Sequence, residues 1–121
     1  MQDAAKTYGA IAKQTASPRE LEADLLLTAA ARLQAIRDSW ERNQSQLDAA
    51  LQYNRKLWSI FMTSATSPDN ALPAGVRQNV ANLGIFVFNQ TLAVLANPKP
   101  ENLGALININ RQLAAGLRGQ T

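Results

Sequence analysis

The chain has 121 residues, of which 46% are hydrophobic, 6% aromatic and 17% charged, with a formal net charge of +3 at pH 7. This length suits one domain, and the abundance of Leu and Ala over aromatic residues favours helices over sheets. The sequence contains no His and no Cys. Disulfides, thiolate chemistry, a His general base and metal sites built from these ligands are therefore excluded. The lack of Cys fits a reducing cytoplasm, where we expect this protein.

Charge is distributed unevenly along the chain. Residues 1–69 hold eight basic and eight acidic residues, whereas residues 70–121 hold four basic residues and one acidic residue. Four dispersed cations do not form the clustered stripe that a nucleic-acid surface requires. We therefore expect no direct nucleic-acid partner. The first ten residues, MQDAAKTYGA, also lack the basic and then apolar pattern of a secretory signal.

Two helices are predicted in the first third of the chain. Residues 3–14 form a short candidate with Tyr8 and Ile11 on its apolar side, which we expect to dock on the remaining helices and to be only marginally stable. A stronger signal follows, because Ser17 is a good N-cap, Pro18 suits the first helical position and Glu20 completes a capping box. This second helix should run to about residue 40. Its predicted core residues are Leu26, Ala29, Leu33, Ile36 and Trp40.

A third helix is predicted over roughly 45–65, because Ser45 is followed three residues later by Asp48. Residues 40–45 contain no Gly or Pro, so the sequence leaves open whether they form a turn or continue the helix. Two Pro residues among several Ser, Thr, Asn and Asp residues then predict a flexible loop over about 63–73.

The fourth predicted helix covers about 73–96, opens at Pro73 and is apolar on nearly all sides. Such a helix is expected at the centre of a bundle, with neighbours on several sides. Because Asn82, Asn89 and Gln90 interrupt the apolar run, we interpret it as a buried helix and expect no membrane insertion. Gly84 lowers helix propensity by about 1 kcal/mol relative to Ala, which indicates the close approach of another helix.

A fifth helix is predicted over 100–117, with Gly116 or Gly119 as its stop. Asn110 stands in the middle of its apolar face, and Asn54 occupies the same place in the third helix. Leu, Asn, Arg and Leu recur in the two helices at 47/103, 54/110, 55/111 and 57/113, which we attribute to shared helical patterning and not to duplication. Each Asn is expected either to hydrogen-bond within the bundle or to face a groove. If the two are buried and paired, replacing one by Leu is expected to be nearly neutral or stabilising for the fold.

The fold class that follows is an all-α, up-and-down bundle of four to five helices in a single domain, residues 1–121. The six glycines are scattered singly, so no phosphate-binding loop is present. The acidic residues at 20, 22 and 24 suit the first turn of a helix and do not indicate catalysis. We expect no enzyme activity, cofactor or metal. Phe86 and Phe88 lie two positions apart on a helix and point to different sides, so one of them is expected at the surface. The candidate partner-binding residues are Asn54, Phe86, Phe88, Ile109, Asn110 and Leu117.

Several segments resemble the FlaF family of flagellar biosynthesis proteins from alphaproteobacteria. They occur in order over nearly the whole chain: Tyr8, then SPRELE at 17–22, YNRKLWSIF at 53–61, NALP at 70–73, LGIFV at 83–87 and INRQLAAGLRG at 109–119. Residues 23–47 and the tip of the loop carry no family mark.

The resemblance implies a small cytoplasmic protein that is needed to make and export flagellin. It would act as a secretion chaperone whose main partner is flagellin, bound through its terminal helical segments. The alternative is a regulator of flagellin translation that acts through a second partner, FlbT. The absence of catalytic residues and the apolar fourth helix are compatible with a protein that binds amphipathic helices in a groove.

Overall fold

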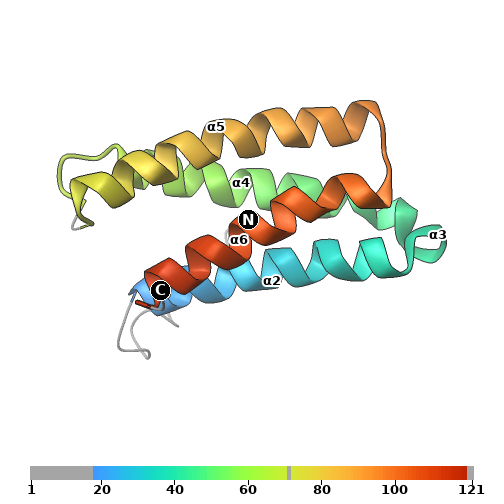
Figure 1. Cartoon of the computed structure of the whole chain (residues 1–121), viewed down its shortest axis with the longest axis horizontal. Coiled ribbons are helices and arrows are strands. Elements are labelled where there is room, and N and C mark those ends of the chain that lie inside the picture. The colour runs from blue at the N-terminus through green and yellow to red at the C-terminus, as the bar shows by residue number, and fades with distance from the viewer. Residues whose placement is uncertain (1–17, 71, 120–121) are drawn as a thin grey trace.

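The computed structural model describes residues 18–70 and 72–119, and shows an antiparallel bundle (Figure 1). The long helices are α2 (Pro18–Asp38), α4 (Leu47–Ala65), α5 (Ala74–Ala96) and α6 (Gly104–Leu117). Shorter elements join them: α3 (Trp40–Asn43) and the 3-10 turns η1 (Gln44–Gln46) and η2 (Pro100–Leu103). The described residues contain no strand, and the predicted all-α, up-and-down bundle is confirmed. The predicted helix over 3–14 and the cap at Ser17 lie outside the described residues.

The four long helices form a ring in which each contacts two neighbours. Helix α6 lies along α2 for most of its length, and α2 also packs on α4 (Figure 1). Helix α5 closes the ring by packing along α4 and, over a shorter stretch, on α6. A hydrogen bond of 3.1 Å from the Gln90 side chain to the carbonyl of Asn102 joins α5 to η2. Helix α5 is therefore held mainly by α4, with a shorter contact to α6.

A polar cluster stands in the middle of the apolar core. The Asn110 carbonyl oxygen of α6 accepts a hydrogen bond from the Trp58 indole N–H at 2.9 Å. Its amide donates to Asn54 Oδ1 at 2.7 Å and to the backbone carbonyl of Leu26 at 3.3 Å. Asn54 and Trp58 belong to α4 and Leu26 belongs to α2, so one side chain links three helices. Of the two expectations for the asparagines, hydrogen bonding within the bundle is the one confirmed.

The recurring pattern of the third and fifth predicted helices corresponds to equivalent positions in the fold. The Leu and Asn members are buried and the Arg members are exposed: Leu47 and Leu103, Asn54 and Asn110, Leu57 and Leu113, Arg55 and Arg111. Both helices present the same sequence of residue types to one core. Burial, and not only spacing, is the same at each pair, and the interpretation as shared helical patterning stays a prediction.

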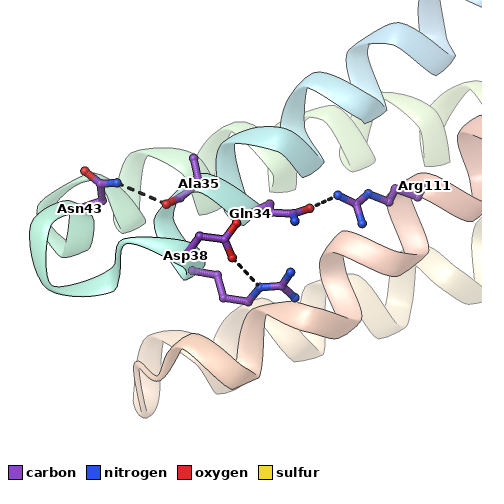
Figure 2. Close-up of polar contacts among 6 residues, drawn as sticks. Gln34, Ala35, Asp38, Asn43 and Arg111 are labelled. Carbon is purple, nitrogen blue, oxygen red and sulfur yellow. Dashed lines mark hydrogen bonds and ion pairs between the residues drawn. The ribbon is translucent and has the colours of Figure 1, made fainter.

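The connection between α2 and α4 differs from both alternatives that the sequence left open for residues 40–45. Helix α2 ends before a turn residue, Ser39, and the short helix α3 and the 3-10 turn η1 then lead into α4. The backbone N–H of Asn43 bonds to the Ser39 carbonyl at 3.0 Å, and its side chain donates to the Ala35 carbonyl at 3.3 Å (Figure 2). The Ala35 carbonyl also accepts the backbone N–H of Ser39 at 3.2 Å, so the Asn43 side chain adds a second hydrogen bond at the C-terminal end of α2. Helix α4 begins at Leu47, so the predicted start at Ser45 is wrong, because η1 takes up that residue.

The predicted core of α2 is confirmed for its four aliphatic members, which are buried: Leu26, Ala29, Leu33 and Ile36. Trp40 lies beyond the end of α2, is half-buried and packs against the core. At the other end of the bundle, Gly119 has φ of 75°, which only glycine adopts readily, and it ends α6 as predicted.

The predicted loop contains the connection between α4 and α5. The Asn70 side chain donates to the Ser64 carbonyl at 3.0 Å and accepts the Leu72 backbone N–H at 2.8 Å. Pro73 then stands at the N-cap of α5. The expected flexibility of this loop stays a prediction.

The prediction that the fourth helix lies at the centre of the bundle is wrong. The buried residues of α5 form one narrow stripe of small or β-branched residues: Val80, Gly84, Val87, Thr91 and Val94. Several larger apolar residues of the same helix point to solvent. The sequence suggested a central helix because it is apolar all round. In the structure the small side chains of α5 pack against α4, and several large apolar side chains are exposed to solvent.

The close approach predicted at Gly84 is confirmed. A Cβ atom at this position would stand 2.6 Å from Cγ of Met62 on α4, well inside van der Waals contact. Met62 is half-buried, so its flexible side chain lies across the glycine and fills the space between α4 and α5.

We expect Gly84→Ala to destabilise the protein by about 1 kcal/mol, because displacing Met62 outweighs the gain in helix propensity. In a Met62→Ala background the same change should stabilise the protein by about 1 kcal/mol, since only the propensity gain remains. Urea denaturation followed by circular dichroism measures both values. The same sign in the two backgrounds would contradict the contact as described.

Candidate partner-binding surface

Helix α5 carries an exposed apolar stripe. Ile85, Leu92 and Leu95 are 56%, 61% and 40% exposed, and half-buried Phe88 stands between the first two. The spacing of three, four and three residues along 85, 88, 92 and 95 places these side chains on one face of the helix. We call this set the α5 stripe. Scattered exposed apolar residues are ordinary in proteins, but a row over three helical turns is typical of a surface that another molecule covers.

Phe86 lies outside the α5 stripe. It is 45% exposed, whereas Phe88 is half-buried and packs against the core. The prediction that the two rings point to different sides and that one reaches the surface is therefore confirmed. Ile60 on α4 is another large exposed side chain, at 57%.

A groove runs beside the α5 stripe, between α5 and α4. It has a volume of about 490 Å³, and its walls are Phe88 and Leu92 from α5 and Gln52, Arg55, Lys56 and Ser59 from α4. Helix α5 contains no acidic residue, and the α4 wall from 52 to 59 contains two cations and no acid. The groove thus combines an apolar floor with a positively charged side.

A smaller hollow lies at the end of the bundle where α2 and α5 begin and α4 and α6 finish. Most of its lining is apolar and includes Phe61, Leu72, Val80, Leu113 and Leu117, with Glu22 beside them. Burial raises the pKa of the Glu22 carboxyl above its ordinary value, while the positive charge of Arg19 opposes this shift.

Because the folded state raises the Glu22 pKa, the folded chain binds a proton more readily than the unfolded chain. Stability from the protonated carboxyl is present below the ordinary value of 4.5 and is lost as the pH rises through the raised pKa. We expect Glu22→Gln to increase the melting temperature at pH 7, and the difference from the native chain to shrink toward pH 4. Melting curves across this range measure the effect. A difference that does not change with pH would contradict it.

The structure separates the residues that the sequence proposed for partner binding. Asn54 and Asn110 are 0% exposed, so in this conformation neither can touch a partner, and we remove both from the candidate surface. Ile109 and Leu117 of α6 are half-buried and pack against the core, with Leu117 at the end hollow. The two Phe residues belong to α5. The six candidates therefore do not form one site.

Sequence reasoning missed Ile85, Leu92 and Leu95, which together with Phe88 form the more continuous surface. Their spacing was present in the sequence. It was hidden because α5 also has an apolar inner stripe of similar spacing, and periodicity alone does not tell which stripe faces the core.

Within residues 18–70 and 72–119, no group of three or more acidic side chains is placed to hold a metal ion. In that same part of the chain, α5 is the one helix long and apolar enough to cross a membrane by length and composition, and 28% of its most apolar window is buried. One such helix is weak evidence for a membrane span.

Comparison with known proteins identifies the family. The family described as "Flagellar protein FlaF" matches residues 4–117, nearly the whole chain. The chain belongs to the FlaF family. A search of curated proteins and a search of solved structures each found no match. This FlaF-family chain is therefore a flagellar protein.

Proposed function

We propose that this FlaF-family protein is an export chaperone that binds flagellin through its terminal helical segments. The observation that carries the proposal is the α5 stripe, a continuous apolar surface on a member of a flagellar family. The terminal segments of flagellin are amphipathic and lack their filament neighbours before export. An exposed apolar helix beside a groove is the kind of surface on which such a segment packs.

The test is a mixture of the purified chain with monomeric flagellin on a sizing column. Coelution of the two proteins is the expected result. The competing role is regulation of flagellin synthesis through FlbT. Coelution with FlbT in the absence of any complex with flagellin would favour that role and contradict the chaperone proposal.

The affinity of this complex should depend weakly on salt. A chaperone that releases its cargo binds in the micromolar to nanomolar range, about 8–12 kcal/mol, and a specific complex of this kind buries roughly 1,200–2,000 Å². Exposed Phe86 and half-buried Phe88 are among the apolar anchors available, and a few large side chains usually dominate such surfaces. Because screening acts on charge and not on apolar burial, we expect less than about a tenfold change in Kd between low and high salt. A fall in affinity of about a hundredfold would show that charge, and not apolar contact, supplies most of the binding free energy.

A further inference from the structure

We propose that the groove between α4 and α5 binds one amphipathic helix of a partner protein, which packs its apolar face on the α5 stripe and places acidic residues against Arg55 and Lys56. This inference rests on the proposed function in one respect: the helix would be a terminal segment of flagellin. The groove, the contacts within it and the charge that the partner helix must carry go beyond that function.

The length of the α5 stripe sets the size of the occupant. Ile85 and Leu95 are ten residues apart, which on a helix corresponds to about 15 Å. A partner helix of about three turns with apolar residues every three or four positions matches this row. Leu92 is the most exposed member and also lines the groove. It is therefore the side chain that gains most burial when a helix is bound.

The charge beside the groove selects the partner. When a helix lies with its apolar face on Phe88 and Leu92, the residues flanking that face on one side come next to α4, where Arg55 and Lys56 line the groove. Acidic residues there would be attracted, and basic residues would be repelled. No described carboxylate forms an ion pair with the Arg55 guanidinium, so within this part of the chain its charge remains available for a partner.

The same charges argue against a second copy of this chain as the occupant. A symmetric contact between two α5 helices would bring two Arg55 guanidinium groups toward one interface. Helix α5 offers no acidic residue to compensate them, and Asp48 of α4 lies outside the groove lining. A lipid surface is also less suitable, because a groove with walls from two helices fits a rod better than a plane. The observations favour an acidic-flanked helix.

The experiment uses the full chain and two synthetic helical peptides of about 20 residues, long enough to span the groove with a turn to spare at each end. Both carry the same Leu stripe, but one is flanked by Glu and the other by Lys. Fluorescence anisotropy gives the two Kd values. We expect the Glu-flanked peptide to bind more than about tenfold tighter, and Arg55→Glu to remove or reverse this preference. Equal binding of the two peptides to the native chain overturns the charge assignment.

Leu92→Glu locates the contact, and Ile60→Glu is its matched control, since Leu92 and Ile60 are 61% and 57% exposed. Leu92→Glu should weaken the Glu-flanked peptide by more than about tenfold, whereas Ile60→Glu should change Kd by less than about twofold. Because both side chains are exposed, both variants should melt like the native chain, and Leu92→Gln repeats the test without adding charge. Similar losses from the two Glu variants, or no loss from Leu92→Gln, overturn the groove assignment.

Monomeric flagellin separates this inference from the proposed function. Flagellin binding that survives Leu92→Glu overturns the groove and leaves the chaperone role in place. No flagellin binding, with the peptide preference intact, overturns the chaperone role and leaves the groove. If the chain binds vesicles of anionic lipid, Leu92→Glu abolishes this binding, and neither peptide binds, the face contacts a membrane and the proposal is overturned. If the chain self-associates, Leu92→Glu abolishes this, and neither peptide is preferred, the face binds a second copy of the chain and the proposal is overturned.

Discussion

Replacing Asn110 by Leu is expected to destabilise the protein by about 2–4 kcal/mol, whereas replacing Asn54 by Leu should change stability by less than about 1 kcal/mol. The two asparagines are alike in burial, both 0% exposed, but they differ in how many groups depend on them. Asn110 bonds to the indole of Trp58, to Asn54 and to the carbonyl of Leu26. Its loss leaves the Trp58 N–H and the Asn54 carbonyl oxygen buried without partners.

For Asn54, the hydrogen bond lost on substitution is offset by the removal of an unsatisfied buried donor. Its Nδ2 atom is buried and has no hydrogen-bond partner among the described residues, so replacing Asn54 removes an unsatisfied donor together with one bond. The Asn110 amide keeps its bond to Leu26. A buried unsatisfied group costs about 1–3 kcal/mol, which is enough to offset the bond that Asn54→Leu loses.

Urea denaturation of the two single variants, followed by circular dichroism, measures the difference. A loss of stability that is equal in the two variants would contradict the central role of Asn110. The hydrogen bonds of Asn110 lead to a different prediction from the one drawn from the sequence, in which replacing either asparagine by Leu was expected to be nearly neutral or stabilising. That expectation holds for a group whose partners are removed with it, and Asn110 has partners that remain.

Much of the fold follows from the sequence because each helix is indicated by the spacing of apolar residues that are close together in the chain. Four long helices were predicted near the observed bounds from the apolar spacing along each helix and from the break at the loop over 63–73. In α2 this spacing is seen at Leu26, Leu33 and Ile36. The close approach at Gly84 was also predictable, because a glycine inside a long helix needs a packing reason. These features depend on residues near each other in the chain.

The features that sequence reasoning missed depend on contacts between distant helices. That Asn54 and Asn110 bond to each other, and that Trp58 joins them, requires knowing that α4 and α6 meet at that level. The placement of α5 also failed for this reason, since both of its faces are apolar and only packing on α4 decides which is covered. The α5 stripe could be recognised as a surface only once its inner stripe was placed.

The destabilising effects of substitutions at Trp58 and Asn110 should be coupled and not additive. Trp58 is 0% exposed and packs edge-on to Phe61, with ring centroids 6.2 Å apart. Trp58→Phe removes the indole N–H, leaves Asn110 Oδ1 unpaired and opens a gap, so we expect a loss of about 2–3 kcal/mol.

The double variant Trp58→Phe with Asn110→Leu should lose about 1–2 kcal/mol less than the sum of the two single losses, because it leaves neither the indole N–H nor the Asn110 oxygen unsatisfied. The matched control joins Trp58→Phe with Thr91→Val. The Thr91 hydroxyl is also buried, but it bonds within α5 to the Val87 carbonyl at 2.7 Å and shares no partner with Trp58. The stability losses of that pair should be additive to within about 0.5 kcal/mol.

Circular dichroism is the suitable readout, since one of the two tryptophans is replaced. Additive losses for Trp58 with Asn110 would mean that the bond between them contributes nothing to the fold. The cluster would then stabilise the bundle only by filling space, and the large effect predicted for Asn110→Leu would need another cause.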